Sequence, residues 1–558
     1  MANYDVFLAS SLEKVFPSRR PRQLPPDSRL SVWPGNRCAV QLVYRAEDIP
    51  YALKGFRIEV CGAPTTPHLR SVELIPAEMP CFEVPQDSDY ITKEPGLYPD
   101  LLQPLQDNRV TIIPRQYRSV WISWEIPPDA TPGEHRVCIS LTAPDDSLRF
   151  ENNLTLRICS SMLPPQTLLH TEWFHGDCLA NYYDTEVFSP LHWQILENFI
   201  ASAARHGVNL LLTPVFTPPL DTAVGGQRRT IQLVDVILEN GTYFFGFEKL
   251  DRWISLCKKY DIANLEIAHL YTQWGAGAAP KIMATVDGNN RQIFGWDTPA
   301  TGEAYRAFLA TFLPALRGRL EELGYGPDRV FFHISDEPGQ GQLEQYRAAR
   351  EQVLPLLDGC HIMDTLSSFD FYRHGLVTEP VVHANHIQEF FDANVPNLWV
   401  YYCGGSAYSP NRMLAMESYR NRIMGVLMYL YNVKGFLHWG FNFYSSQYSL
   451  RSIDPYRNTH GDFWVPAGDT HLVYPGPDGT PLDSLRAEVQ DEALADLRAL
   501  QLLEKLAGRE AVEKLIHEGC GMIRITFMDY PRQPSYLLQL RERLADAICA
   551  LQPDTTAE

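Results

Sequence analysis

Two adjacent carboxylates, Asp336 and Glu337, stand at the end of a short apolar run and directly before a Pro-Gly pair. Residues 330–334 of that run have the composition of a short buried strand. Two acids at the end of such a strand lose solvation unless a partner or a reaction uses them. We therefore hypothesise that the pair cleaves a glycosidic bond. Pro338 additionally predicts an extended backbone at Glu337.

The same stretch also has a purely structural interpretation. Ser335 or Asp336 could cap a helix that begins at Pro338, since Ser and Asp are favoured caps and proline is favoured at the first helical position. A cap explains the proline but not the polar surroundings that are predicted for the pair.

The elements that position the pair follow from the alternation of strands and helices after residue 164. Eight apolar runs with amphipathic segments between most of them are typical of a (β/α)8 TIM barrel, in which the chemistry lies at the carboxyl ends of the strands. The predicted strands span residues 168–172, 209–213, 264–269, 330–334, 361–365, 381–385, 398–402 and 435–439. The predicted helices span residues 191–206, 248–260, 302–323, 343–357, 412–431 and 483–506.

The first part of the chain has a different pattern. Short alternating runs, such as residues 119–126 and 134–141, are separated by Pro and Gly, which predicts a β-sandwich. The fold class is therefore α/β, an N-terminal β-sandwich followed by a (β/α)8 barrel with a helical C-terminal tail. We place a sandwich domain at 1–163, a catalytic barrel domain at 164–510 and a helical extension at 511–558.

Polar and aromatic residues follow the predicted strands, and such residues bind and stack on sugar rings. Candidate substrate-binding residues are His175, Asp221, His269, Trp274, Tyr402, Trp439, Asn442 and Tyr444. Each also has a structural interpretation. A lone aromatic residue packs in a core about as often, and a histidine in this position is more often a satisfied structural residue.

The seventh and eighth predicted strands carry no acid at their ends. An ordinary retaining glycosidase needs a second carboxylate on the far side of the sugar, and adjacent residues do not flank an anomeric carbon. Substrate assistance removes this need, because the 2-acetamido group of an N-acetylhexosamine attacks its own anomeric carbon. Asp336 would accept the acetamido N–H and stabilise the oxazolinium ion, while Glu337 would protonate the leaving oxygen and then activate water.

Two further roles complete this mechanism. A tyrosine, Tyr402 or Tyr444, would hydrogen-bond the acetamido oxygen. Trp439 would form the floor under the sugar ring.

Composition limits the partners. The chain has 48 basic and 67 acidic residues and a net charge of −19, which disfavours nucleic acid and anionic membranes. The start lacks a signal-peptide pattern, and no segment approaches the length of a membrane span. Eleven scattered cysteines without a CxxC pair predict reduced thiols in a cytoplasmic protein, with neither a metal site nor a cofactor. Nothing in the pattern specifies an oligomeric state.

The chain resembles the glycoside hydrolase family 123 group over nearly its whole length, to about residue 506. The segments that carry the resemblance are residues 95–100, 212–222, 269–275, 294–298, 332–338, 435–444 and 467–476. The resemblance implies a retaining exo-β-N-acetylgalactosaminidase that hydrolyses a β-GalNAc-terminated glycan by substrate assistance. It implies Asp336 as the acid that orients the acetamido group and Glu337 as the acid/base. Characterised members are often exported, whereas this sequence shows no leader.

Alternative hypotheses stay open beside it. One is another β-N-acetylhexosaminidase. A second is an ordinary two-carboxylate β-glycosidase in which Glu337 acts with Asp364 or Glu172. The third is a sugar-binding protein without catalysis, against which the acid pair argues.

Overall fold

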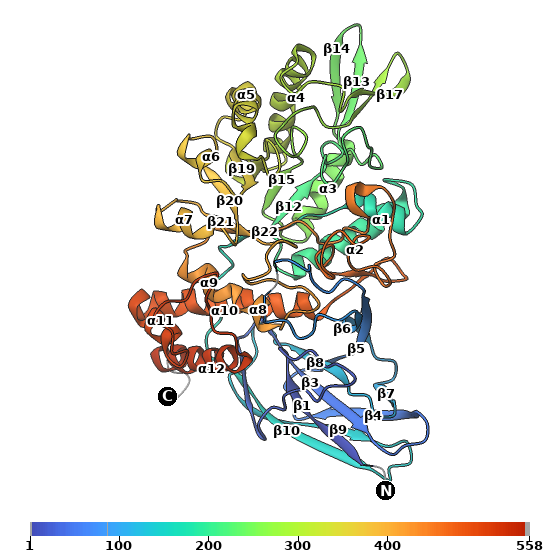
Figure 1. Ribbon diagram of the computed structural model, residues 1–558, viewed down its shortest axis with the longest axis vertical. Coiled ribbons are helices and arrows are strands. Elements are labelled where there is room, and N and C mark those ends of the chain that lie inside the picture. Colours follow the sequence, from blue (N-terminus) through green and yellow to red (C-terminus); the bar gives the residue numbers. More distant parts are fainter. Residues whose placement is uncertain (1–2, 86, 553–558) are drawn as a thin grey trace.

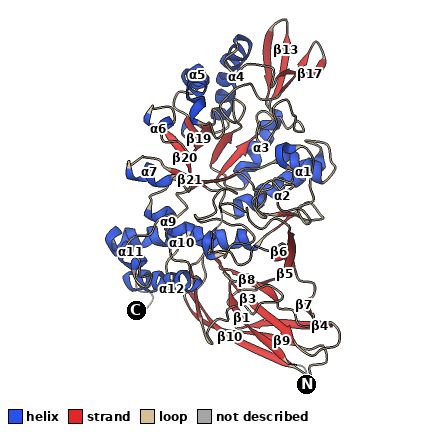
Figure 2. Ribbon diagram, in the orientation of Figure 1, coloured by secondary structure: helices blue, strands red, loops and turns tan. Residues whose placement is uncertain are grey.

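The computed structural model describes residues 3–85 and 87–552. The barrel lies at one end of an elongated molecule and the β-rich region at the other, with the last helices packed between them (Figure 1). Strands form the centre of the barrel, strands and loops form the N-terminal region, and helices surround the barrel (Figure 2).

The N-terminal region forms two five-stranded sheets, as the alternating runs predicted. One has the order β1 (Tyr4–Ser10), β3 (Arg37–Ala46), β8 (Arg118–Glu125), β5 (His68–Ala77), β6 (Gly96–Pro104). The other has the order β2 (Arg29–Val32), β10 (Arg149–Ile158), β9 (Gly133–Thr142), β4 (Leu53–Cys61), β7 (Arg109–Ile112). Val120 and Ile122 of β8 belong to the core of this region, whereas Trp121 between them packs with Leu485, because successive strand residues face opposite sides.

All eight predicted barrel strands are confirmed as one parallel sheet. Its order is β11 (Leu169–Glu172), β22 (Gly435–His438), β21 (Trp399–Tyr401), β20 (Glu379–His383), β19 (His361–Leu366), β18 (Val330–Phe332), β15 (Asn264–Ile267), β12 (Leu210–Thr213). The ring nearly closes between β11 and β12. There Asn209 accepts the His170 backbone N–H at 2.8 Å and donates its own backbone N–H to the His170 carbonyl at 3.1 Å.

Four helices around the barrel, within residues 190–205, 248–259, 303–322 and 343–353, follow predicted segments, whereas three short ones, within residues 176–182, 370–373 and 387–392, were not predicted. The helices around the barrel are α1 (Gly176–Tyr182), α2 (Pro190–Arg205), α3 (Glu248–Lys259), α4 (Glu303–Glu322), α5 (Leu343–Val353), α6 (Asp370–Arg373), α7 (Ile387–Asp392), α8 (Tyr419–Arg422) and α9 (Met424–Leu430). The helix predicted over 412–431 is wrong in its first part, since residues 412–418 are irregular. Arg412 is used there to bind both oxygens of Glu172 at 2.7 Å.

Two hairpins on the barrel were not predicted. They are β13 (Asp235–Glu239) with β14 (Thr242–Gly246), and β16 (Ile282–Val286) with β17 (Asn289–Phe294), joined into one four-stranded sheet. A short pair, β23 (Tyr474–Pro475) and β24 (Pro481–Leu482), follows β22.

The C-terminal helices fasten the two ends of the molecule together. They are α10 (Leu485–Ala507), α11 (Arg509–His517) and α12 (Pro534–Leu551). Glu542 of α12 accepts hydrogen bonds from the backbone N–H of Ser31 at 2.8 Å and from its hydroxyl at 2.7 Å. Among the described residues no helix is long and apolar enough to span a membrane. The domain boundaries at residues 163 and 510 stay predictions.

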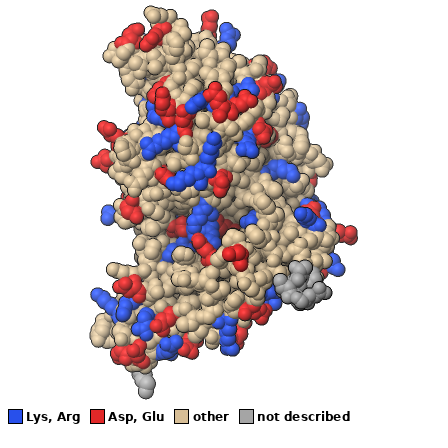
Figure 3. Space-filling view, turned by 180° about the vertical axis from the view of Figure 1, so that it is seen from behind, with Lys and Arg blue, Asp and Glu red and all other residues tan. Residues whose placement is uncertain are grey.

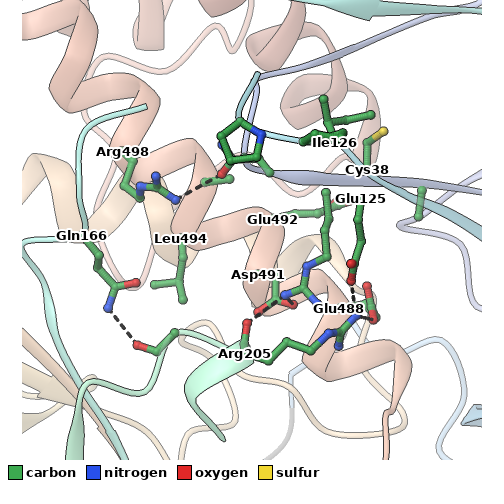
Figure 4. Close-up of a pocket in the computed structure, with 18 of the residues that line it drawn as sticks. Cys38, Glu125, Ile126, Gln166, Arg205, Glu488, Asp491, Glu492, Leu494 and Arg498 are labelled. Carbon is green, nitrogen blue, oxygen red and sulfur yellow. Dashed lines mark hydrogen bonds and ion pairs between the residues drawn. The ribbon is translucent and has the colours of Figure 1, made fainter. Parts of the chain in front are cut away.

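A cavity of about 710 Å³ lies between the N-terminal sheets, the end of α2 and α10 (Figure 4). We call the charged groups beside it, Arg37, Arg205, His206, Asp483 and Asp491, the interdomain cluster. His206 lies between the two carboxylates, 2.9 Å from Asp491 and 3.0 Å from Asp483. Burial opposes its charge, but the Asp491 and Asp483 carboxylates raise the pKa of His206 to about 9. Acidic and basic side chains are also intermixed across the back of the molecule (Figure 3).

Candidate active site

A smaller cavity, about 290 Å³, lies at the carboxyl ends of the barrel strands. Asp336 and Glu337, which follow β18, line it together with three predicted binding residues, Asp221, Trp274 and Trp439. The other lining residues are Phe82, Trp173, Gln273, Thr365, Tyr401, Cys403, Gly404, Gly405, Leu437, Trp464, Val465 and Asp469. The acid pair therefore stands where a barrel enzyme places its chemistry.

The neighbouring strand β19 fixes the backbone that carries the pair. Asp364 accepts the N–H of Ile334 at 3.0 Å and the N–H of Ser335 at 3.3 Å. Asp364 in turn lies 3.2 Å from His333, whose other ring nitrogen lies 2.7 Å from Glu266. Burial opposes the charge on His333, but Asp364 and Glu266 raise its pKa to about 9. A buried imidazolium thus holds two carboxylates behind the acid pair.

Thr365 contacts both members of the pair. Its hydroxyl donates to Oδ1 of Asp336 and accepts the backbone N–H of Glu337 at 3.2 Å. Glu337 has φ +43°, in the left-handed region, so the extended backbone predicted from Pro338 is wrong. A left-handed backbone costs a non-glycine residue roughly 1–2 kcal/mol, and the Thr365 bond helps to hold it.

The helix-cap interpretation is wrong as well. The first helical turn after the pair is a short 3-10 segment, Gln340–Gln342, and its cap is Gly339. Ser335 instead donates to the Thr272 carbonyl at 2.9 Å and accepts the N–H groups of Gly275 and Ala276.

Within the part of the chain that the structure describes, three of the four carboxyl groups in this cavity lack a cationic partner, whereas Asp469 lies 3.4 Å from His438. Among the described residues, no Lys, Arg or His forms an ion pair with Asp336, Glu337 or Asp221. Burial raises the pKa of Asp336 well above its usual range, and the charges of Glu337 and Asp221 add to this. Burial likewise raises the pKa of Asp221 to about 7, with contributions from Glu337 and Asp469. Such unneutralised acids in a cleft are typical of catalytic sites.

Tyr401 and Asp469 complete the polar part of the wall. The Tyr401 hydroxyl donates to Oε1 of Glu337. Asp469 accepts the Gly404 N–H at 2.8 Å and the Trp439 indole N–H at 3.1 Å. The rings of Trp439 and Trp464 lie 5.1 Å apart, so two aromatic faces border the acids.

The other five predicted binding residues do not line the cavity. His175 and Asn442 bind one another, with the Asn442 side chain accepting the His175 N–H at 2.9 Å and donating to its carbonyl at 3.1 Å. The Tyr444 hydroxyl donates to the Val473 carbonyl at 2.8 Å, and the His269 ring stacks on His333 at 4.1 Å. These contacts are structural.

Tyr402 illustrates how a strand determines which side chain reaches the cavity. Its ring packs 5.3 Å from Phe436 and 5.3 Å from His438 and is fully buried. Tyr401, the residue before it, lines the cavity, because adjacent residues at a strand end face opposite sides.

Sequence reasoning therefore missed several lining residues, chiefly Trp173, Thr365, Tyr401, Trp464 and Asp469. Trp173 and Thr365 stand at predicted strand ends and could have been included. Trp464 and Asp469 belong to the long segment after β22, where no strand-end rule applies.

His269, His333 and Asp364 form a cluster with metal-binding geometry, since one potential ligand atom of each lies within 4.8 Å of the others. Both ring nitrogens of His333 are already bonded to carboxylates. These bonds account for the cluster without an ion.

Comparisons with known proteins agree with this architecture. The model of the glycoside hydrolase 123 catalytic domain matches residues 173–503, more than half of the chain. A family 123 glycoside hydrolase from Clostridium perfringens, whose structure is described for glycolipid glycan hydrolysis, superposes with a TM-score of 0.76. It is 14% identical and the match covers 98% of each chain, so it shows the same fold.

Other solved structures are more distant. A β-glucuronidase from Parabacteroides merdae has 12% identity over 86% of this chain and 51% of its own, with a TM-score of 0.29. A β-D-glucuronidase from Dictyoglomus thermophilum has 10% identity over 83% and 69%, with a TM-score of 0.32. Both scores are too low to carry an argument. No curated protein sequence matches the chain. The extent of the family match shows that this chain belongs to glycoside hydrolase family 123 and is a glycoside hydrolase.

Proposed function

We propose that the protein is a retaining exo-β-N-acetylgalactosaminidase that uses the acetamido group of its substrate as the nucleophile. The observation that carries the proposal is the adjacent pair Asp336 and Glu337, without a cationic partner, in a cavity of about 290 Å³. Such a volume lies at the lower end for small-molecule sites and suits one terminal sugar.

Asp336 would orient the acetamido group. Its Oδ1 is occupied by Thr365, which leaves Oδ2 to accept the acetamido N–H. Burial and the neighbouring charge of Glu337 raise the pKa of Asp336 and so disfavour its charge. The positive oxazolinium ion that forms when the acetamido oxygen bonds to C1 would favour that charge.

Glu337 would move the proton. In the first step it gives a proton to the glycosidic oxygen as the C1–O bond breaks. In the second step it takes a proton from water, whose oxygen bonds to C1 as the oxazolinium ring opens, so the anomeric configuration is retained. The hydrogen bond from Tyr401 holds one oxygen of Glu337 and leaves the other for this transfer.

Asp221 and Asp469 would accept sugar hydroxyls, and Trp439 with Trp464 would stack on the ring. A carboxylate near the C4 hydroxyl would distinguish galacto from gluco sugars. The preference for GalNAc rests on the family resemblance. A cytoplasmic setting is part of the proposal and is supported by eleven cysteines, all within the described residues and all free thiols.

The two-carboxylate alternative needs a different second carboxylate from the two that the sequence suggested. Glu172 is fully buried and bound by Arg412, and Asp364 is fully buried beside His333. Asp221 or Asp469 would have to act with Glu337 instead, since both line the cavity. This alternative predicts turnover of sugars that lack an acetamido group.

A substrate panel tests the proposal. The 4-nitrophenyl and methyl β-glycosides of N-acetylgalactosamine, N-acetylglucosamine, galactose and glucose are compared by kcat/KM. We expect turnover of the acetamido sugars, galacto above gluco, and inhibition by the matching thiazoline. Equal turnover of galactosides without an acetamido group would exclude substrate assistance.

Glu337→Gln tests the acid/base role in the same panel. We expect kcat to fall by about 10²–10⁴-fold. The loss should be larger for the methyl glycoside, whose poor leaving group needs the proton, than for the 4-nitrophenyl glycoside. Near-full activity on the methyl glycoside would remove Glu337 from this role. Glu151→Gln on the exposed face of β10 is the matched control.

A further inference from the structure

Three aromatic residues at the cavity mouth have a backbone conformation that bulky residues avoid. Among the described residues, four aromatic side chains have a positive φ, and three of them are Trp274 (+60°), Tyr448 (+58°) and Phe463 (+61°). Their side chains are 38%, 37% and 64% exposed. The fourth, Phe188, has an evident packing role, since its ring stacks on Trp193 at 5.2 Å. Of the other three, Phe463 stacks on His460 at 4.4 Å and Tyr448 contacts Trp274, yet each of the three remains more than a third exposed, so packing does not fully account for the strain.

We call Trp274, Tyr448 and Phe463 the rim, because each either lines the cavity or adjoins a residue that does. Trp274 lines the cavity, and the Tyr448 ring stands perpendicular to it at 6.0 Å. The turn of Tyr448 is bonded to the cavity wall through Ser449, whose hydroxyl donates to the Asp221 carbonyl at 2.8 Å. Phe463 directly precedes Trp464, another lining residue.

Hydrogen bonds join the turns that carry Tyr448 and Phe463. The Gln447 N–H donates to the Gly461 carbonyl at 3.2 Å. Arg451 forms an ion pair with Asp462 at 2.6 Å. The turns of Tyr448 and Phe463 are therefore held against each other.

The neighbouring structure holds each strained position in place. The Trp274 N–H donates to the Asp336 carbonyl at 2.8 Å, and the Trp274 carbonyl accepts from Gln342. The Phe463 N–H donates to His460 at 2.7 Å. Strain that is held this firmly is typical of positions that present a side chain to a ligand.

We propose that Trp274, Tyr448 and Phe463 form an aglycone platform, on which the pyranose ring of the leaving group stacks. The inference rests on the proposed function. A cavity that takes one sugar leaves the second sugar at the mouth, and exposed aromatic faces suit the apolar C–H face of a pyranose. The preferred substrate class is therefore an oligosaccharide, in which the cleaved residue is attached to another sugar ring.

The test compares kcat/KM for three glycosides of N-acetyl-β-galactosamine whose aglycones are methyl, octyl and a galactose ring. The variants are Phe463→Asn and Tyr448→Asn, because asparagine tolerates a positive φ and removes only the ring. We expect the ratio of the galactose-linked to the methyl substrate to fall roughly five- to tenfold in each variant. Phe244→Ala is the control, since Phe244 is 51% exposed on the β14 hairpin.

An unchanged ratio, or equal losses on all three substrates, would overturn the platform. A loss confined to the octyl glycoside would assign the rim to an alkyl chain and would overturn the sugar-ring assignment. If the wild type cleaves none of the three, the proposed function has failed. Calorimetry with the galactose-linked and methyl glycosides then decides the platform separately. The platform proposal is supported if Phe463→Asn weakens binding of the galactose-linked glycoside at least fivefold more than binding of the methyl glycoside. Any smaller difference overturns it.

Discussion

The catalytic cavity and the interdomain cavity treat carboxylates in opposite ways. In the interdomain cluster burial is offset by Arg37 and His206, which hold the pKa of Asp491 below its usual range. In the catalytic cavity burial outweighs the charges of Arg228 and His333, which form no ion pair with these acids, and the pKa values of Asp336 and Asp221 rise. The charges beside the larger cavity therefore stabilise the fold. The acids in the smaller cavity have raised pKa values and are free to interact with a substrate.

The same contrast holds for the backbone. The barrel sequence accepts a left-handed conformation at Glu337 and Trp274 to place two side chains. An active site of this kind lowers the unfolding free energy, and the paired charges elsewhere in the molecule help to offset that loss.

Among the changes that test the contrast between the two cavities, Asp336→Asn should have the largest effect. Loss of the charge that stabilises the oxazolinium ion is expected to lower kcat by about 10²–10³-fold on N-acetyl-β-galactosaminides. Thermal unfolding at pH 8 should be unchanged or should shift upward. Asp336 has a folded-state pKa above its unfolded value, so its ionisation destabilises the fold as pH rises. A lower unfolding temperature with normal kcat would contradict the conclusion that Asp336 has no cationic partner.

Asp491→Ala should have the opposite signature. It leaves Arg37 without a carboxylate partner and removes one of the two carboxylates that His206 contacts, and breaking a buried pair of this kind costs about 3–5 kcal/mol of unfolding free energy. Denaturant titration measures the loss, and kcat of the folded fraction should stay the same. Glu151→Gln removes an exposed partner of Arg149 and should change stability by less than about 0.5 kcal/mol. Equal effects of the two variants would remove the distinction between the cavities.

The unfolding free energy of the wild type should decrease as pH rises from about 6.5 to about 9. The folded-state pKa of His206, about 9, lies above its unfolded value near 6.5. Its contribution is therefore fully present below pH 6.5 and is lost as pH rises through 9. Urea midpoints across this range should decline less in His206→Gln. Because His333 has a similar pKa, His206→Gln should reduce the decline without abolishing it.

Asp221 should produce the smallest effect, a change in the shape of the pH profile. Its carboxyl is protonated below about pH 7 and charged above it. A charged carboxylate accepts a sugar hydroxyl more strongly, so kcat/KM should gain about two- to fivefold through pH 7. Asp221→Asn should lack this step. A step of the same size in the variant would assign the titration to another group.

The eight barrel strands could be predicted because each is a short apolar run with turn signals on either side. The position of Asp336 and Glu337 at the end of β18 followed from the same pattern. Residues 412–418 could not be predicted correctly, since helical periodicity does not reveal that Arg412 neutralises Glu172 across 240 positions. The two hairpins on the barrel could have been predicted, because Asn240-Gly241 and Asp287-Gly288 at their turns are typical two-residue hairpin loops between strand-like runs.

The candidate site was predictable only where a strand end delivers it. The choice of Tyr402 over Tyr401 failed by one residue, because strand register decides which neighbour faces inward. Asp469 and Trp464 come from a long irregular segment, and only the folded chain brings them beside Trp439. The left-handed backbone of Glu337 depends on Thr365, a contact from another strand.

The bonds between α12 and β2 also have a consequence for biosynthesis. Ser31 and Glu542 are 511 positions apart, so β2 stays uncovered until the ribosome has passed residue 542. Translation adds about 5–20 residues per second, and the sandwich strands emerge long before α12. The nascent chain therefore exposes the edge of β2 for on the order of a minute. A chaperone that assists this protein should act at that edge, while the barrel is still being made.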